Sequence, residues 1–264
     1  MDDKKNDIFN FYEYQCDENN RLNRARINCV EFLTTMKYIQ NTILPQSEIL
    51  DACAGTGVYA FPLAKMGYTV TAGDLVDFNV TQIRNKQEDN PILKKVYTGS
   101  ILDLSMFKDN SFDVVLNLGA FYHFKYEEDR IKSITESMRV LKPNGIYCLA
   151  YLNRYANYLK YNSQMKGNFD IFEEYMNKGY NEENYLFYAT TPEDIESFMP
   201  SFGLKQIYNI ATDGVKFIMS DTVNSFNDNE FERWLNIHYQ TCEVKSILGY
   251  SEHGLYIGRK AEHI

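Results

Sequence analysis

The sequence predicts an α/β fold in which a doubly wound, mostly parallel sheet of seven strands has helices on both faces. Two observations carry this prediction. Apolar runs of strand length alternate with segments of helical periodicity between residues 48 and 152, and the strongest run, 112–118, is apolar almost throughout. A parallel strand that is covered on both faces has this composition. Regular alternation of strands and helices implies right-handed crossovers and hence a parallel sheet.

Each element has recognisable boundaries. Pro143, Asn144 and Gly145 predict a turn before the fifth strand, and Thr191 followed by Pro192 predicts the N-cap and first residue of a helix. The expected strands are residues 48–51, 68–74, 94–97, 112–118, 146–152, 204–210 and 254–258, and the expected helices are 58–66, 79–87, 127–141 and 228–241.

Two segments interrupt the alternation. Residues 7–42 carry apolar side chains at helical spacing, so we expect an N-terminal helical cap over residues 1–44, followed by a domain over residues 45–264. Residues 153–189 are polar and rich in tyrosine. We expect this insertion to form an aromatic-rich lid over the carboxyl edge of the sheet, after the fifth strand.

Composition narrows the classes of partner. The formal net charge of −9 disfavours nucleic acid, because proteins that bind phosphate backbones depend on a basic surface. No stretch approaches the ~20 apolar residues of a membrane span, and the N-terminus lacks the apolar core of an export signal. The five cysteines have no paired spacing, so a metal site is not expected and reduced thiols in the cytoplasm are. No feature of the sequence indicates an oligomeric state.

A glycine loop follows the first expected strand. Residues 55–60 have the form G-x-G-x-x-A, and Asp74 lies 19 residues after Gly55, at the end of the second strand. Glycines allow the backbone to approach a ligand closely, and a carboxylate at this place can accept bonds from both hydroxyls of a ribose. NAD and S-adenosylmethionine both contain such a ribose, so Asp74 does not distinguish them.

Asp51 favours one of these two ligands. At the end of the first strand its carboxylate would repel a pyrophosphate and attract a cationic amine. Residues 49–57 resemble the first motif of the class I S-adenosylmethionine-dependent methyltransferases, although Cys53 stands where that family has its first glycine. Residues 99–104, 110–115 and 139–145 resemble later motifs of the same family, in the same order.

The resemblance implies a Rossmann-like fold that binds S-adenosylmethionine and releases S-adenosylhomocysteine. Ser100 and Ile101 would border the adenine, with Ser100 standing where the family often has an aspartate. Asn117 and Leu118 would face the methionine portion, and an arginine of the N-terminal segment could pair with the carboxylate of the cofactor. The expected cofactor-binding residues are Tyr12, Arg21, Asp51, Ala52, Cys53, Gly55, Asp74, Leu75, Ser100, Ile101, Asn117 and Leu118.

Methyl transfer from a sulfonium is an in-line displacement, so the protein must mainly hold the acceptor about 3–3.5 Å from the methyl carbon. A neutral hydroxyl or an ammonium acceptor also needs a base. His123, five residues beyond Leu118, is the candidate catalytic residue, with a purely structural role as the alternative.

The sequence is compatible with several functions. The leading hypothesis is methylation of a small molecule in a pocket formed by the lid and the N-terminal helices. A nucleic-acid or protein methyltransferase is the alternative, but residues 117–120 lack the prolines of the motif used on adenine amino groups. An inactive S-adenosylmethionine-binding protein and, more remotely, an NAD-dependent oxidoreductase complete the set.

Overall fold

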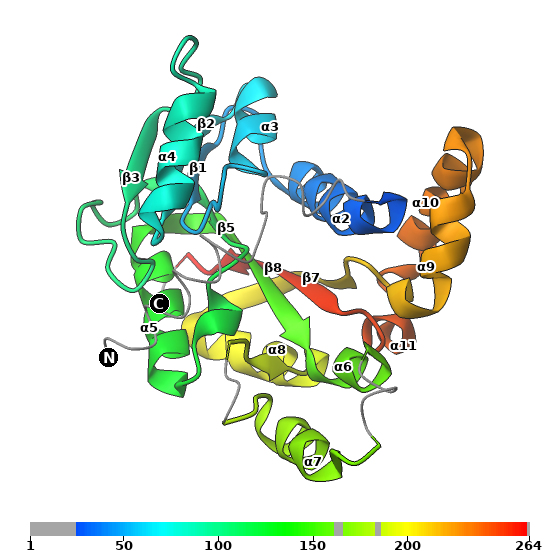
Figure 1. The fold of residues 1–264 in the computed structure, drawn as a ribbon. Coiled ribbons are helices and arrows are strands. Elements are labelled where there is room, and N and C mark those ends of the chain that lie inside the picture. The colour runs from blue at the N-terminus through cyan, green and yellow to red at the C-terminus, as the bar shows by residue number, and fades with distance from the viewer. Residues whose placement is uncertain (1–24, 161–165, 183–185, 263–264) are drawn as a thin grey trace.

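An eight-stranded sheet with helices on both faces organises the chain in the computed structural model, which describes residues 25–160, 166–182 and 186–262 (Figure 1). Seven strands follow the order β3-β2-β1-β4-β5-β8-β7, and β6 pairs with β5. Neighbours are parallel from β3 to β5, and β8 runs antiparallel to both β5 and β7. The strands are β1 (Glu48–Asp51), β2 (Thr69–Asp74), β3 (Lys95–Thr98), β4 (Phe112–Asn117), β5 (Leu141–Asn153), β6 (Ala189–Thr190), β7 (Leu204–Ala211) and β8 (His253–Lys260).

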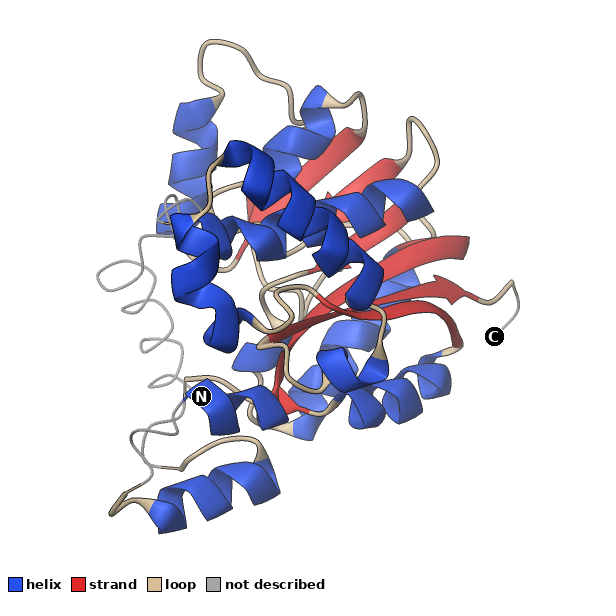
Figure 2. Ribbon diagram, turned by 90° about the vertical axis from the view of Figure 1, so that its right-hand side faces the viewer, coloured by secondary structure: helices blue, strands red, loops and turns tan. Residues whose placement is uncertain are grey.

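Two helical layers cover the sheet, as Figures 1 and 2 show. Buried residues of α2, α3 and α4 pack on one face, and those of α5, α8 and η4 pack on the other. The helices are α2 (Arg26–Thr42), α3 (Ala60–Lys65), α4 (Asp77–Lys86), α5 (Glu127–Val140), α6 (Arg154–Lys160), α7 (Phe169–Lys178), α8 (Pro192–Phe198), α9 (Lys216–Ser225), α10 (Asp228–Thr241) and α11 (Lys245–Leu248), with the 3₁₀ turns η2 (Phe121–His123) and η4 (Met199–Phe202).

The central strands are apolar because both of their faces are covered. In β1, Ile49 packs under α2 and α3, while the next residue, Leu50, packs on the opposite side with the α5 layer. In β4, Leu116 and Val115 divide in the same way. This confirms the prediction of a doubly wound sheet with a parallel centre.

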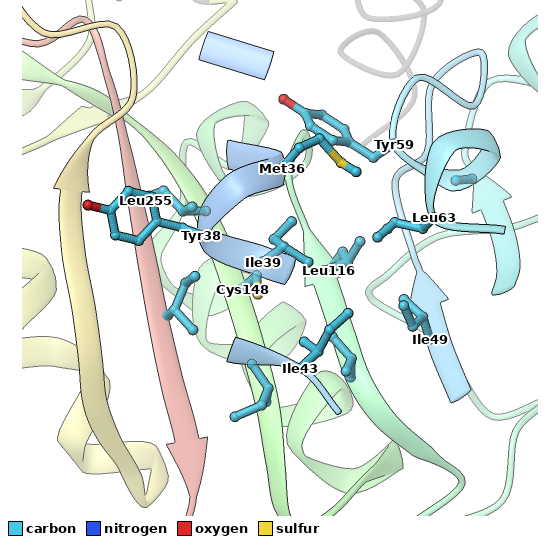
Figure 3. Packing of buried hydrophobic residues seen from close by; sticks show 14 of the residues in the cluster. Met36, Tyr38, Ile39, Ile43, Ile49, Tyr59, Leu63, Leu116, Cys148 and Leu255 are labelled. Atoms are coloured by element: carbon cyan, nitrogen blue, oxygen red, sulfur yellow. The ribbon is translucent and has the colours of Figure 1, made fainter. Parts of the chain in front are cut away.

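Helix α2 belongs to one helical layer. Its residues Met36, Ile39 and Ile43 are almost fully buried in the main core cluster. Figure 3 shows them facing side chains of four strands and of the α3 region: Ile49, Leu116, Cys148, Leu255, Tyr59 and Leu63. The second half of the expected cap is therefore part of the core, and residues 1–24 lie outside the described ranges.

Three details differ from the sequence-based expectations. The sheet gains the two-residue strand β6, which pairs with the end of β5. The expected turn at Pro143–Gly145 lies inside β5, where the ladder with β4 shifts register and Asn144 takes a φ of 62°. Leu141 pairs with Phe112 before this irregularity, so β5 starts earlier than its apolar run. The segment expected as a lid contains α6 and α7.

Capping residues mark the start of two helices that the sequence predicted. The Thr191 hydroxyl accepts a hydrogen bond from the Asp194 amide, as an N-cap should, and α8 starts at Pro192. Helix α10 starts with a capping box between Asn227 and Glu230. Within the described ranges, every helix is too short or too polar to cross a bilayer.

Candidate functional site

A cleft opens at the carboxyl edge of the sheet, where the loops after β1, β2, β3 and β4 meet. The empty space along it amounts to about 840 Å³, a figure that includes space open to solvent. Parallel strands bring the ends of distant segments together at such an edge, which is where open α/β sheets bind ligands. The lining comes from residues 52–55, 58–59, 74–76, 79, 99–101, 118–120 and 122–124.

The loop after β1 needs its two glycines for different reasons. Gly55 and Gly57 both have positive φ, at 54° and 89°. A Cβ on Gly57 would also lie 2.7 Å from the ring of Phe61 in α3, so the close packing of the loop on that helix excludes a side chain.

Asp74 ends β2 and fixes this loop. Its Oδ2 accepts a hydrogen bond from the Gly55 amide at 2.8 Å, and its Oδ1 accepts from the Val76 amide at 2.9 Å and from Asn79 Nδ2 at 3.1 Å. Burial raises the pKa of the Asp74 carboxyl, and these three donors offset part of that rise. A carboxylate has about four acceptor positions, so at least one remains for a ligand.

Asp51 ends β1 and differs from Asp74 in its surroundings. It is 1% exposed, and neither of its carboxyl oxygens has a hydrogen-bond partner. Burial and, to a lesser extent, the nearby Asp74 carboxylate raise its pKa to about 7. Thr56 Oγ1, in the same loop, is also buried without a partner. Unsatisfied buried polar groups are costly, and their concentration in one loop fits a ligand-binding role.

Cys53 links the loop after β1 to the end of β4. Its sulfur accepts a hydrogen bond from the Gly119 amide at 3.2 Å, and its thiol lies 3.7 Å from Asn117 Oδ1. Asn117 is fully buried and donates to the Tyr147 hydroxyl at 3.0 Å. Asn117 therefore faces the core, behind the wall of the cleft.

The wall formed by the loop after β3 contains Ser100 and Ile101. Ser100 Oγ accepts a hydrogen bond from the Leu102 amide at 3.1 Å, which shapes the turn, and Ile101 is buried in the core on its far side. Leu75 lies on the cleft as well. This part of the cleft offers apolar surface and backbone groups.

His123 lies in η2, on the wall formed by the loop after β4. Its Nδ1–H donates to the Leu186 carbonyl at 3.1 Å, because a carbonyl oxygen can only accept. Burial lowers the pKa of His123 to about 4, so the ring is neutral at physiological pH. The rings of Tyr122 and Phe187 lie 5.0 and 5.1 Å from it. Residues 186–188 of the insertion thus contact η2.

The structure brings most of the expected site residues together. Lining the cleft are Ala52, Cys53, Gly55, Asp74, Leu75, Ser100, Ile101, Leu118 and His123. Asp51 and Asn117 lie buried next to it, and Tyr12 and Arg21 lie outside the described residues. Sequence reasoning missed ten lining residues: Ala54, Val58, Tyr59, Val76, Asn79, Gly99, Gly119, Ala120, Tyr122 and Phe124. Each lies within about five positions of an expected site residue, and this proximity is the signal that could have identified them.

A second group of ionisable residues lies beyond β5, where β7 ends and β8 begins. Ligand atoms of Asp213, Glu252 and His253 all lie within 4.8 Å of one another, which is close enough to hold a metal ion. Cations of the protein already pair with these acids: Lys216 lies 3.6 Å from Asp213 and 3.2 Å from Glu252, and Lys160 also pairs with Glu252.

Comparison with known proteins gives a consistent result. Residues 50–149 match the model of a methyltransferase domain. Among curated proteins, the chain is 28% identical over 134 residues to the ubiquinone biosynthesis O-methyltransferase of Rickettsia akari, covering 51% of each chain. It is 34% identical over 107 residues to the glycine/sarcosine N-methyltransferase of Aphanothece halophytica, covering 40% of each. The chain thus spans about half the length, or less, of these relatives.

Solved structures share the fold across more of the chain. An S-adenosylmethionine-dependent methyltransferase of Methanosarcina mazei superposes with a TM-score of 0.59 at 18% identity, covering 85% of this chain and 97% of its own. The 1,6-didemethyltoxoflavin-N1-methyltransferase of Burkholderia thailandensis, with bound S-adenosylhomocysteine, gives a TM-score of 0.58 at 12% identity, covering 98% and 87%. The cleft and the matched segment coincide at the loops after β1 to β4. Residues 50–149 therefore match a methyltransferase domain, and the chain shares the fold of solved S-adenosylmethionine-dependent methyltransferases.

Proposed function

We propose that this protein is an S-adenosylmethionine-dependent methyltransferase that acts on a small molecule by in-line methyl transfer. The observation that carries the proposal is Asp51, a buried carboxyl without a partner beside a cleft of adequate size. A methionine ammonium group would supply the missing positive charge and the missing donors. The pyrophosphate of a nicotinamide cofactor would be repelled at the same place.

The rest of the cleft supports a consistent placement of the cofactor. Asp74 keeps an acceptor position for a ribose hydroxyl, although its three internal hydrogen bonds favour one such contact over two. Leu75 and Ile101 provide apolar surface for a purine. S-Adenosylmethionine supplies an electrophilic methyl group, and the chain's own residues bind, orient and exclude water.

His123 and its neighbours would form the acceptor side. A neutral imidazole with a pKa of about 4 is a weak base at physiological pH, so we assign His123 mainly to orienting the acceptor through a hydrogen bond. The rings of Tyr122 and Phe124, which line the cleft beside His123, favour an acceptor with a flat apolar body and a hydroxyl or amine group. The net charge of −9 supports a small molecule over a nucleic acid as the acceptor.

The four cysteines that the structure describes are all free thiols: Cys29, Cys53, Cys148 and Cys242. Free thiols persist in a reducing compartment. This supports a cytoplasmic location for the proposed activity.

Calorimetric titration with S-adenosylmethionine, S-adenosylhomocysteine and NAD tests the proposal before any acceptor is known. We expect both adenosyl ligands to bind and NAD not to bind. Binding of NAD alone, or of none of the three, would contradict the proposal. A panel of catechols, phenols and amines, assayed for release of S-adenosylhomocysteine, then identifies the acceptor class, and no turnover with any acceptor despite tight binding would favour an inactive binding protein.

A further inference from the structure

The cleft contains a side chain that neither cofactor binding nor methyl transfer requires by its chemistry. Cys53 stands in the loop after β1 and contacts the loop after β4, so it touches both walls of the cleft. We call its contacts with the Gly119 amide and with Asn117 Oδ1 the Cys53 bridge. The bridge continues inward, because Asn117 Nδ2 donates to the Tyr147 hydroxyl in β5.

The chemical state of the thiol excludes a reactive role. Burial, together with the carboxylates of Asp51 and Asp74, raises the pKa of Cys53 far above its usual range. The thiolate is the form that reacts with electrophiles and binds metals. A group that stays protonated can instead donate its S–H to Asn117 and accept a hydrogen bond from Gly119 at the same time.

The two loops approach each other closely at the bridge. A Cβ added to Gly119 would lie at ordinary contact distance, 3.4 Å, from the carbonyl oxygen of Cys53, so the two backbones are about one methyl group apart. Gly119 has no side chain, so the Cys53 side chain fills the space between Gly119 and the loop after β1. The separation of the two walls at this end of the cleft therefore depends on the size and bonding of residue 53.

Two buried polar side chains without partners lie close to Cys53 in the sequence. Cys53 lies two residues after Asp51 and three residues before Thr56, and both of these neighbours have buried polar oxygens without partners. Buried polar groups without partners are costly, so this loop needs contacts that hold it in place. The Cys53 bridge is one such contact with the end of β4, beside the hydrogen bond from the Ala52 amide to the Leu116 carbonyl at 3.1 Å.

We propose that Cys53 is a positioning residue, whose bridge to Gly119 and Asn117 preorganises the two walls of the cleft for the adenosyl cofactor. The proposal rests on the proposed function, because it takes S-adenosylmethionine as the ligand. Holding the walls in place before binding reduces the ordering cost that binding must otherwise offset. Loss of the bridge weakens cofactor binding without removing any group that touches the adenine or ribose.

Calorimetry with S-adenosylhomocysteine as the probe tests this on three variants. Cys53→Ala removes the bridge, and we expect its affinity to fall about three- to tenfold, the range of one net hydrogen bond. Cys53→Ser keeps a hydroxyl that can accept from Gly119, so its affinity should stay within about twofold to threefold of the wild type. Cys148→Ala, in the core of β5, is the matched control: it should lower the urea midpoint and leave the affinity unchanged.

Hydrogen exchange of the Gly119 amide gives a readout that a general loss of stability would not imitate. Exchange should accelerate in Cys53→Ala, return toward the wild-type rate in Cys53→Ser and stay unchanged in Cys148→Ala. Wild-type affinity in Cys53→Ala, or an equal loss of affinity in Cys148→Ala, would overturn the role of Cys53. Failure of the wild type itself to bind S-adenosylhomocysteine would refute the proposed function, which is a distinguishable outcome.

Discussion

Two groups of buried acids lie at the same edge of the sheet and differ in how they are satisfied. In the cleft, Asp51 has no hydrogen-bond partner, and its pKa rises to about 7. Beyond β5, Asp213 accepts from Ser251 Oγ at 2.7 Å, from the His253 amide at 3.1 Å and from His253 Nδ1 at 2.8 Å. His253 and Lys216 hold the pKa of Asp213 well below its usual range. The pKa of a buried aspartate is thus raised at Asp51, which has no hydrogen-bond partner, and lowered at Asp213, which has several.

We interpret this difference as a role in binding for Asp51 and a role in stabilising the fold for the cluster around Asp213. The ion-pair cluster of Asp213, Lys216, Glu252 and His253 also includes Lys160 of α6 and Glu31 of α2, whose carboxylate lies 3.7 Å from His253 Nδ1. Its charges are paired within the protein, and it ties three helices to the sheet. The Asp51 carboxyl has no hydrogen-bond partner within the protein, as the proposed role in cofactor binding requires. We therefore expect mutations in the cluster to affect stability and mutations at Asp51 to affect binding.

The largest expected effect is on stability. Asp213→Ala removes the fully buried carboxylate that Lys216 and His253, both partly buried, share, and it should lower the free energy of unfolding by about 3–5 kcal/mol. Urea denaturation at pH 7 measures this. Asp221→Ala, on the exposed face of α9, is the matched control and should change it by less than about 0.5 kcal/mol. A loss below about 1 kcal/mol for Asp213→Ala would contradict a structural role for the cluster.

Asp51→Asn should weaken cofactor binding without lowering stability, in contrast to Asp213→Ala. Loss of a charge-assisted contact with the cofactor should weaken S-adenosylmethionine binding about 10- to 100-fold in calorimetry. The free energy of unfolding should stay constant or rise, because the variant no longer buries an ionised group without a partner. A protein that unfolds more easily and binds normally would instead assign Asp51 to the framework.

The smallest effect concerns pH. Nearby carboxylates of Glu31, Asp213 and Glu252 raise the pKa of His253 against the effect of burial. The folded state then binds a proton more tightly than the unfolded state, so this stabilisation is present below about pH 6.5 and is lost as the pH rises through the folded pKa. His253→Asn should thus cost more stability at pH 6 than at pH 9, by about 1 kcal/mol in urea denaturation. An equal cost at both pH values would mean that His253 is not protonated in the cluster.

The sequence predicted the fold, and most of its expected site residues line one cleft, because both depend on local patterns. Strands β1, β2 and β4 end where apolar runs meet Asp51, Asp74 and Asn117, and parallel topology brings those ends together. The orientation of Asn117 toward Tyr147 was not predictable, since a one-residue change of direction at a strand end exchanges cleft and core.

The features that the sequence did not predict depend on contacts between residues far apart in the chain. The ion-pair cluster joins residues 31, 160, 213–216 and 252–253, which share no local pattern. The contact between His123 and the Leu186 carbonyl depends on how the insertion folds back on η2. Periodicity and spacing record neither of these.

Proton release on cofactor binding tests most directly whether the unpaired Asp51 is reserved for a cation. Because its pKa is raised to about 7, part of the carboxyl is protonated near pH 7 and must ionise to pair with the methionine ammonium group. Calorimetric titration with S-adenosylhomocysteine at pH 7, in buffers with different heats of ionisation, should show a proton release in the wild type that Asp51→Asn lacks. Equal proton release in the two proteins, or none in either, would contradict the account.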